Sequence, residues 1–496
     1  MTREEFLGLQ NGSDVRGVAL AVAGGKPVNL TEEAVGRIAA FFVRWLAARL
    51  GRAAEGLRIG VGRDSRVTGP ALQGATLAAL SGAGAQAFDC GMASTPAMFM
   101  GTVFPDCALD GAIMLTASHL PAERNGMKFF TRDGGLDKGD ITALLEGAAE
   151  LDLPAGAGAA APLPLMERYT AFLREKIAAD CGGGDRPLAG LHIVVDAGNG
   201  AGGFFAQEVL EPLGADCTGS QFLEPDGTFP NHIPNPENGA AMAAIRGAVT
   251  EHHAHLGLIF DTDVDRMSAV LSDGRAVNRD AIIAMMAAIL APDCPGGTIV
   301  TDSVTSDRLT RFLEGLGLRH LRYKRGYRNV INKAQALNAE GVDAPLAIET
   351  SGHGALRENY FLDDGAYMAV KLVIAAARAG EGGLAALIAD LPPAGEEGER
   401  RIPISGSDTA AYGQKVLEAF EQRARERGIA VAQPSYEGVR LTLPGQGWLL
   451  LRLSLHDPLL PLNVESDAPG GCAGLLALAG ELLAGFDRLD LSVLAQ

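Results

Sequence analysis

The sequence predicts an α/β fold of three similar domains followed by a smaller α+β domain. Short apolar runs that end in Gly or Asp alternate with Ala- and Leu-rich stretches at helical spacing, which is the pattern of α/β units. Three of the runs are alike, since each leads from a buried strand into an Asp and small polar residues: 57–66, 191–200 and 297–306. The aspartates Asp64, Asp196 and Asp302 in these runs are separated by domain-sized intervals. We therefore expect three related α/β domains in tandem.

Two Pro- and Gly-rich segments, 151–165 and 392–400, are predicted linkers. After the second linker we expect a helix from Asp408 to Arg427, with Ser407 or Asp408 as its N-cap. Four strands and a helix follow, near 429–433, 437–443, 447–454, 460–465 and 470–486, which together make a two-layer α+β domain. The expected domains are 1–155, 165–275, 276–392 and 398–496.

Composition excludes several classes of protein. The 496 residues carry a net charge of −18, which argues against a nucleic-acid partner because phosphate binding needs a basic face. The six cysteines are scattered, without a C-x-x-C pair, which fits a reducing compartment rather than a zinc ribbon or disulfide scaffold. We expect no signal peptide, because the first residues carry acids early and no apolar stretch, and no transmembrane helix, because no run of about 18 apolar residues occurs. We expect a cytoplasmic protein without a membrane partner.

The segment LTASHLPAERNGMK (115–128) is the first candidate for chemistry. Ser118 follows the apolar run GAIML and lies in a loop bent by Pro121 and Gly126, where a strand end can expose a nucleophile. His119 and Lys128 could act as acid, base or phosphate ligand. An ordinary surface loop in which the Ser caps a helix is the alternative interpretation. The segment lacks G-x-S-x-G, which disfavours a serine hydrolase.

The segment LIFDTDVDR (258–266) predicts a metal site. Asp261, Asp263 and Asp265 occupy every second position after an apolar run, so in an extended chain their carboxylates point to one face. Three such carboxylates repel one another unless a cation lies between them, and oxygen ligands suit Mg²⁺. Arg266 beside them would suit an anion next to the metal. A solvated acidic turn is the alternative.

Three further groups of residues could bind a phosphorylated sugar. IETSGHG places Glu349, Ser351 and His353 in one loop, and such groups hydrogen-bond sugar hydroxyls, although a capped turn would look the same. LLLRLSLHDP and YKRGYRN add possible phosphate ligands, which could equally be simple surface charge: Arg452, Ser454 and His456 in the first, and Lys324, Arg325 and Arg328 in the second. GNGAGG (198–203) matches a dinucleotide fingerprint, but the acid expected about 20 residues later would be Glu224 in a turn, so we disfavour nucleotide binding.

The motifs resemble, in order and spacing, those of the α-D-phosphohexomutases, the phosphomannomutase/phosphoglucomutase group. TASHLP (116–121) and DTDVDR (261–266) are the specific ones, and the supporting ones are GSDVRG (12–17), GRDSR (62–66), FPNHIPNPE (229–237), ETSGH (349–353) and the Arg-x-Ser loop at Arg452. The resemblance implies four domains around a central cleft, three of them with similar mixed sheets. It also implies a monomer or homodimer that interconverts hexose 1-phosphate and hexose 6-phosphate, of glucose or mannose.

The resemblance also implies roles for individual residues. Ser118 would carry a phosphoryl group, with Mg²⁺ held by that group and by Asp261, Asp263 and Asp265, and a hexose 1,6-bisphosphate would act as activator. The other implied contacts are Lys128 and His119 beside the reacting hydroxyl, Arg16 and Arg266 on the phosphoserine, Glu349 and Ser351 on sugar hydroxyls with His353 beside them, and Arg452 and Ser454 on the second phosphate.

The chain departs from the family's pattern in three places. Leu455 and His456 replace residues that normally help to cradle the phosphate, Tyr327 stands where many relatives have a Gly-His pair contacting substrate, and Leu120 replaces a common Asn. Two alternatives therefore stay open. One is a mutase-like protein that binds sugar phosphates without turnover. The other is a haloacid-dehalogenase-type phosphatase with Asp261 as nucleophile, which would leave TASHLP unexplained.

Overall fold

The computed structural model describes residues 1–153, 160–379, 383–454 and 457–495. The chain forms two compact units. The first contains Met1–Asn278 and Ser351–Ala385, and the second contains Arg279–Thr350 and Ala386–Gln496. One crossing between the units therefore falls inside the ETSGH motif. Among the helices of the described residues, none is both long and apolar enough to cross a membrane.

The amino-terminal part of the first unit is built on a mixed sheet, in which eight strands are described. The strand order is β1-β2-β6-β5-β3-β4-β8, with β7 paired to β6. The strands β5, β3, β4 and β8 run parallel, whereas β6 is antiparallel to β5 and to β2. Their bounds are β1 Gln10–Asn11, β2 Asp14–Val18, β3 Arg58–Arg63, β4 Gln86–Met92, β5 Gly111–Leu115, β6 Arg124–Thr131, β7 Gly134–Gly135 and β8 Ala161–Pro162.

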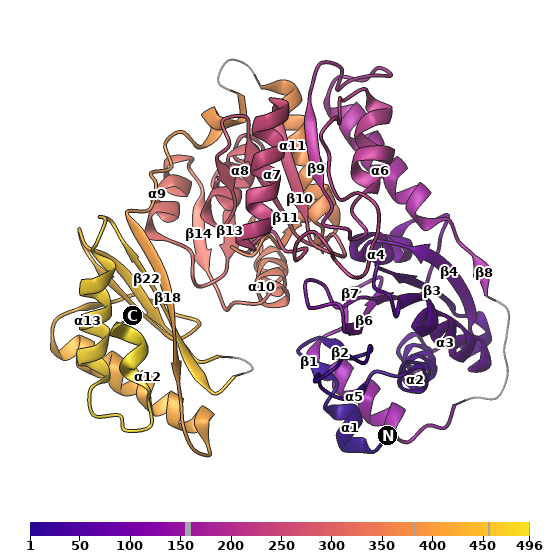
Figure 1. Ribbon diagram of the computed structural model, residues 1–496, viewed down its shortest axis with the longest axis horizontal. Coiled ribbons are helices and arrows are strands. Elements are labelled where there is room, and N and C mark those ends of the chain that lie inside the picture. The colour runs from indigo at the N-terminus through magenta and orange to yellow at the C-terminus, as the bar shows by residue number, and fades with distance from the viewer. Residues whose placement is uncertain (154–159, 380–382, 455–456, 496) are drawn as a thin grey trace. The chain divides into compact units, whose positions relative to one another are not determined.

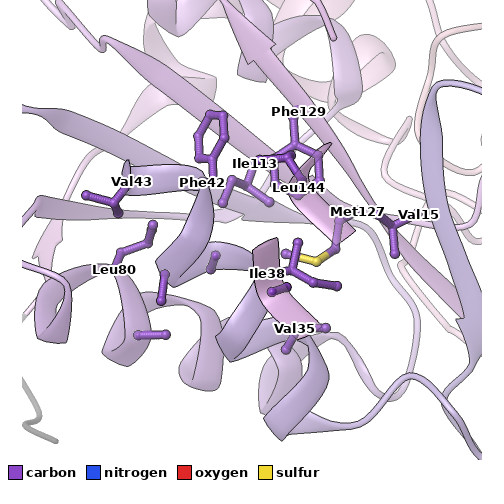
Figure 2. Packing of buried hydrophobic residues seen from close by; sticks show 14 of the residues in the cluster. Val15, Val35, Ile38, Phe42, Val43, Leu80, Ile113, Met127, Phe129 and Leu144 are labelled. Atoms are coloured by element: carbon purple, nitrogen blue, oxygen red, sulfur yellow. The ribbon is translucent and has the colours of Figure 1, made fainter. Parts of the chain in front are cut away.

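The core of this sheet fixes the two strands that frame the serine loop. Helix α2 (Glu32–Leu50) begins after Thr31, whose hydroxyl accepts the N–H of Ala34, and ends at Gly51 in the left-handed conformation. Its buried face packs on β5 and β6 (Figure 2), where the rings of Phe42 and Phe129 lie 5.1 Å apart. The other helices of this region are α1 Arg3–Leu7, α3 Gly69–Gly82, α4 Thr95–Val103 and α5 Lys138–Ala149.

A second sheet in the first unit carries the aspartate motif. Its order is β12-β11-β10-β9, with β9 and β10 parallel and β11 antiparallel to β10. Helices α7 and α11 both lie against β10 (Figure 1), and every residue of β10 is buried, as expected for a strand covered on both faces. The bounds are β9 Ile193–Asp196, β10 Leu256–Phe260, β11 Met267–Leu271, β12 Ala276–Val277, α6 Leu165–Asp180 and α7 Gly239–His252. The segment that returns to this unit, Ser351–Ala385, contains the antiparallel pair β16 Gly354–Leu356 and β17 Leu362–Asp363, which is not part of this sheet, and helix α11 Gly365–Arg378.

The second unit begins with three parallel strands in the order β14-β13-β15. The strands are β13 Thr298–Thr301, β14 Arg319–Arg322 and β15 Leu346–Ile348, and the helices around them are α8 Asp280–Leu290, α9 Asp307–Gly315 and α10 Tyr327–Ala339. As predicted, the three strand-to-Asp runs are buried strands that end beside or at Asp64, Asp196 and Asp302.

The carboxy-terminal region is a two-layer α+β structure, as predicted. An antiparallel sheet in the order β18-β22-β21-β20-β19 packs on α12 and α13 through one apolar core. In Figure 1 both helices lie on one side of this sheet. The bounds are β18 Glu396–Pro403, β19 Ala430–Val431, β20 Val439–Leu443, β21 Gly447–Leu451, β22 Leu459–Ser466, α12 Thr409–Glu426 and α13 Cys472–Leu483.

The predicted linkers need correction. Residues 396–400 belong to β18, an edge strand paired with β22, in which the exposed charged residues Glu397, Glu399 and Arg401 alternate and therefore lie on one face of the strand. Of the other linker, residues 154–159 lie outside the described part of the chain, and Ala161–Pro162 adds a strand to the first sheet. Asp408 precedes α12 as predicted, but its side chain makes no capping hydrogen bond because its backbone is left-handed, with φ 55°.

Candidate active site

Ser118 lies in the turn that leaves β5, in a strained conformation. Its φ is +49°, which is uncommon for a residue with a side chain, and its exposed fraction is only 7%. The Ser118 N–H donates to the hydroxyl of Thr116 over 2.9 Å, which holds this turn. Neither a helix cap nor a free surface loop describes Ser118. A buried, strained serine at a strand end is instead typical of a functional position.

Arg66 stabilises the loop that contains Ser118. We had not predicted a role for this residue from the sequence. Its guanidinium is fully buried and donates to the backbone carbonyls of Ser118, Leu120, Pro121 and Arg124. It also pairs with Asp64, with 3.2 Å between Nε and Oδ2. The GRDSR motif thus supplies a buried cation, Arg66, whose carbonyl partners lie more than 50 residues away in the sequence. The sequence feature that could have identified Arg66 is its position two residues after Asp64, at the end of a predicted strand.

The carboxylates of Asp261, Asp263 and Asp265 converge, but not by the predicted geometry. The segment is a turn between β10 and β11 rather than an extended chain, and Val264 within it has a φ of +67°. The three side chains are at most 1% exposed, and one carboxylate oxygen from each lies within 4.8 Å of the others. This burial rules out the solvated acidic turn.

Two of these carboxylates each keep one oxygen without a donor. The Thr95 hydroxyl donates to Asp263 Oδ2 over 2.5 Å, and Lys128 Nζ binds the same oxygen over 3.1 Å and also pairs with Asp265 Oδ2. Among the described residues, no hydrogen bond reaches Asp263 Oδ1 or Asp265 Oδ1, although both atoms are buried; His353 Nδ1 and Arg266 Nε lie 3.8 Å and 4.0 Å from Asp265 Oδ1. Buried anionic oxygens without donors are costly, so this arrangement fits a hard cation.

Asp261 connects the cluster to the serine. The Ser118 hydroxyl donates to Asp261 Oδ2 over 2.9 Å, and Arg266 donates from Nη2 to Ser118 Oγ over 3.2 Å and from Nε to Asp261 over 3.1 Å. Burial raises the pKa of Asp261, with Asp265 acting in the same direction. The pKa of Asp265 is lowered, because Lys128, His353 and Arg266 outweigh the opposing effect of burial.

Two histidines approach this centre in opposite charge states. The surrounding protein atoms and the positive charge of Arg266 lower the pKa of His119, although its side chain is solvent-exposed, and its Nδ1 lies 3.4 Å from Ser118 Oγ. For His353 burial acts downward, but the carboxylates of Asp363 and Asp265 raise the pKa to about 9. His353 Nδ1 lies 2.6 Å from Asp363 and 3.8 Å from Asp265. The site therefore offers one neutral and one cationic imidazole.

The other sequence-predicted residues of the first unit surround this centre. Arg16 donates to the carbonyl of Thr116 over 2.6 Å and pairs with Asp14 over 2.7 Å, so it anchors the base of the serine loop. The Ser351 hydroxyl is buried and has no hydrogen-bond partner among the described residues. Asn235, from the FPNHIPNPE motif, accepts from Arg266 over 3.4 Å.

The glycine-rich run 198–203 packs beneath the aspartate turn. The N–H of Ala201 donates to the carbonyl of Thr262 over 2.8 Å, and a Cβ on Gly200 would lie 2.7 Å from Thr262 Cα. The run needs glycine for this close approach between two backbones. Its match to a dinucleotide fingerprint thus has a packing explanation.

In the second unit, a second group of sequence-predicted residues gathers near the ends of β13, β14 and β15. Glu349 is 4% exposed and accepts the N–H of Gly326 over 2.6 Å, which fixes the loop that contains exposed Lys324 and begins α10 at Tyr327. Arg325 Nε lies 3.8 Å from Asp302.

Arg452 and Ser454 follow β21 in the same unit. Arg452 is 7% exposed, and its Nη1 lies 4.0 Å from Glu437, a residue that the sequence analysis did not single out. The Ser454 hydroxyl accepts the N–H of Asp457 over 3.2 Å. His456 and Leu455 lie outside the described residues, so the predictions on them are not addressed by the structure.

Known proteins match most of the chain. The sequence matches the phosphoglucomutase/phosphomannomutase alpha/beta/alpha domains I, II and III over residues 8–152, 167–274 and 278–394. It is 31% identical over 417 residues to the phosphomannomutase/phosphoglucomutase of Pseudomonas aeruginosa, covering 82% of this chain and 83% of the relative. It is 29% identical over 465 residues to a phosphoglucomutase of Neisseria gonorrhoeae, covering 92% of each.

A solved structure matches nearly the whole chain. The crystal structure of a phosphoglucomutase/phosphomannomutase family protein from Burkholderia thailandensis superimposes with a TM-score of 0.80 and 27% identity, covering 98% of this chain and 99% of that one. The domain matches and the relatives thus define an enzyme that transfers a phosphoryl group, a mutase. The chain belongs to the phosphoglucomutase/phosphomannomutase family and is a phosphohexomutase. The predicted family and fold class are confirmed, and the dehalogenase-type and binding-only alternatives are set aside.

Proposed function

We propose that this phosphohexomutase interconverts the 1- and 6-phosphates of glucose, mannose or both, through a phosphoserine at Ser118 and a bisphosphorylated intermediate. The observation that carries the proposal is the contact of the Ser118 hydroxyl with Asp261 and Arg266, at the edge of a buried carboxylate cluster. A hexose 1,6-bisphosphate would phosphorylate Ser118 and so activate the enzyme. The four domains at 1–155, 165–275, 276–392 and 398–496 and a monomeric or dimeric cytoplasmic enzyme remain part of this proposal.

Asp261, Asp263 and Asp265, together with the phosphoryl group on Ser118, would hold Mg²⁺. The fit rests on the donor-free oxygens Asp263 Oδ1 and Asp265 Oδ1 and on the preference of Mg²⁺ for carboxylate and phosphate oxygen. The bound ion supplies neutralisation of the negative charge on the transferring group. A phosphoserine adds close to two negative charges, and Arg266 lies where it can pair with them.

The chain's own residues would manage the proton and the leaving oxygen. A sugar hydroxyl attacks the phosphorus as the bond to Ser118 Oγ breaks, so the hydroxyl proton must leave and Ser118 Oγ must be stabilised. His119 is neutral and lies beside Ser118, which suits it to accept that proton at a ring nitrogen. Arg266 donates to Ser118 Oγ and would stabilise the negative charge that develops there. Lys128 holds Asp263 and Asp265 in place.

The remaining predicted residues would bind the sugar phosphate. Glu349 offers a carboxylate, and the Ser351 hydroxyl has no hydrogen-bond partner among the described residues, so both suit sugar hydroxyls, with His353 beside Ser351 in sequence. Arg325, Arg452 and Ser454, with Lys324 and Tyr327 nearby in the sequence, would hold the non-reacting phosphate. His456 stays a predicted ligand of that phosphate.

Phosphorus NMR tests the proposal. Purified chain is incubated with Mg²⁺, a trace of glucose 1,6-bisphosphate, and glucose 1-phosphate or mannose 1-phosphate in turn. We expect the 6-phosphate signal to appear, and to be lost in Ser118→Ala but not in Ser492→Ala, a matched change at an exposed carboxy-terminal serine. Release of inorganic phosphate instead, or turnover by Ser118→Ala, would refute the phosphoserine route.

A further inference from the structure

Glu437 makes contacts in the second unit that the proposed function does not use. Its side chain is 11% exposed and its Oε2 accepts two hydrogen bonds, from the Ser303 hydroxyl and, over 3.1 Å, from the N–H of Arg325. The other oxygen, Oε1, faces Arg452 with 4.0 Å to Nη1. One carboxylate thus joins the loop after β13, the loop before α10 and the end of β21.

The backbone is shaped to bring this carboxylate to Arg452. Gly438, directly after Glu437, has a φ of +64°, and a Cβ there would lie 2.2 Å from the Leu451 carbonyl and 2.8 Å from Arg452 Cα. Only glycine permits this approach, since any side chain would force the two strands apart.

Arg452 itself is poorly satisfied by the protein. Its Nε is buried without a hydrogen-bond partner among the described residues, and Glu437 is its ion-pair partner there. Burial disfavours the charged guanidinium, and so does the nearby Arg325, while Glu437 acts in the opposite direction. A guanidinium in this state gains strongly from a second anion, and a substrate phosphate would be that anion.

We propose that Glu437 sets the affinity of the phosphate site: its carboxylate already neutralises part of the charge on Arg452, so a substrate phosphate must share the guanidinium with it. This inference rests on the proposed function. In such a mutase the bisphosphorylated intermediate must leave the phosphate site, turn round and bind again. A phosphate contact that stabilises the bound ground states and the transition state equally would slow dissociation of the intermediate without accelerating phosphoryl transfer. The Glu437 carboxylate repels a phosphate bound beside it, and this repulsion keeps the affinity low enough for the intermediate to dissociate.

The substitution Glu437→Gln isolates the charge. Both hydrogen bonds to Glu437 use Oε2, so the amide oxygen can keep them while an uncharged NH₂ group replaces Oε1 opposite Arg452. Removing one charge about 4 Å from the guanidinium is expected to tighten phosphate binding by about tenfold. Release of the intermediate then becomes slower, so KM and kcat should fall together.

Two measurements decide the proposal. Calorimetric titration with glucose 1-phosphate, mannose 1-phosphate and inorganic phosphate is made in a Ser118→Ala background, which prevents turnover. Adding Glu437→Gln should lower the Kd, whereas Glu418→Gln should not, because it removes the same charge on the exposed face of α12, where its partner is Gln414. With Ser118 intact, we expect Glu437→Gln to lower both kcat and KM.

An unchanged or higher Kd in Glu437→Gln, or no binding of any of the three probes, would overturn the proposal, and a higher Kd would assign Glu437 to positioning Arg452. Failure of the proposed function would look different. The chain would then bind a hexose phosphate but form no 6-phosphate from it, while the comparison of Kd values would still test the role of Glu437. Circular dichroism and thermal unfolding show that each variant is folded before it is titrated.

Discussion

At the level of single residues, the site depends on side chains whose hydrogen bonds fix the orientation of the residues at its centre. Asp263 is the clearest case. The Thr95 hydroxyl donates to its carboxylate oxygen Oδ2 over 2.5 Å, Lys128 binds the same oxygen, and the Thr95 N–H donates to the backbone carbonyl of Asp263 over 2.8 Å. The contacts on Oδ2 leave Oδ1 without a hydrogen bond among the described residues, so Oδ1 would be the ligand atom of the proposed Mg²⁺ site. Outer contacts of this kind fix the orientation of metal ligands and contribute to affinity.

Replacing Thr95 should therefore weaken cation binding without removing a ligand. We expect Thr95→Val, which keeps the shape but loses the hydroxyl, to raise the apparent Kd for Mg²⁺ about tenfold. Thr95→Ser keeps the hydroxyl and is the matched control. The measurement is the Mg²⁺-dependent shift of the unfolding temperature. Equal shifts in Thr95→Val and in the wild type would show that the hydroxyl does not orient Asp263.

Arg66 is expected to matter for stability as much as for activity. Arg66→Met removes the cation from a fully buried pair and takes the guanidinium's hydrogen bonds away from Asp64 and four carbonyls. Breaking a buried pair in this way costs about 3 to 5 kcal/mol. Urea unfolding followed by circular dichroism measures the change. A loss below about 1 kcal/mol, as for exposed ion pairs, would mean that the loop is held by other contacts.

At the scale of elements, loops far apart in sequence are joined at strand ends. His232, from the FPNHIPNPE motif, places Nε2 3.1 Å from both carboxylate oxygens of Asp196 at the end of β9. Burial lowers the pKa of His232, but the hydrogen bond and charge of Asp196 outweigh it, so the pKa is raised. The charged pair ties the loop over 229–237 to the second sheet.

This raised pKa fixes the sign of a pH effect. Because the folded pKa lies above the unfolded value, the stabilisation is complete below the unfolded pKa and is lost as the pH rises through the folded pKa. His232→Gln should therefore lower the unfolding temperature more at pH 6 than at pH 9. Differential scanning calorimetry at the two pH values measures this. The opposite order, or equal losses, would contradict a charged His232 in the folded state.

The aspartate turn and the glycine-rich run form another such junction. Gly200→Ala would place a methyl group against Thr262, in the turn that carries Asp261 and Asp263. We expect this variant to bind Mg²⁺ several-fold more weakly, because the turn must shift and its carboxylates separate. Gly247→Ala is the control, since a Cβ on Gly247 meets no neighbouring atom. Wild-type Mg²⁺ affinity in Gly200→Ala, measured by thermal shift, would contradict the packing role.

At the level of the complete chain, the secondary structure of a single segment could be predicted from its sequence pattern. Contacts between residues that lie far apart in the sequence could not. The strand-to-Asp runs at Asp64, Asp196 and Asp302 fixed three α/β regions, since burial and period are local properties. The carboxylates of DTDVDR were predicted to converge, but through strand alternation rather than the observed turn at Val264. Arg66 and Thr95 were missed because their partners lie far along the chain. Spacing alone also grouped His353 with Glu349, whereas its imidazole pairs with Asp363 beside Asp265.

In the proposed mechanism Ser118 carries the phosphoryl group. The direct measurement is intact-protein and tandem mass spectrometry after incubation with Mg²⁺ and glucose 1,6-bisphosphate, followed by addition of excess glucose 1-phosphate. We predict that one phosphoryl group is found on Ser118 and is exchanged in the second step, and that Ser118→Ala gains none. A phosphoryl group on Asp261 or any other residue, or none in a chain that still forms the 6-phosphate, would contradict the account.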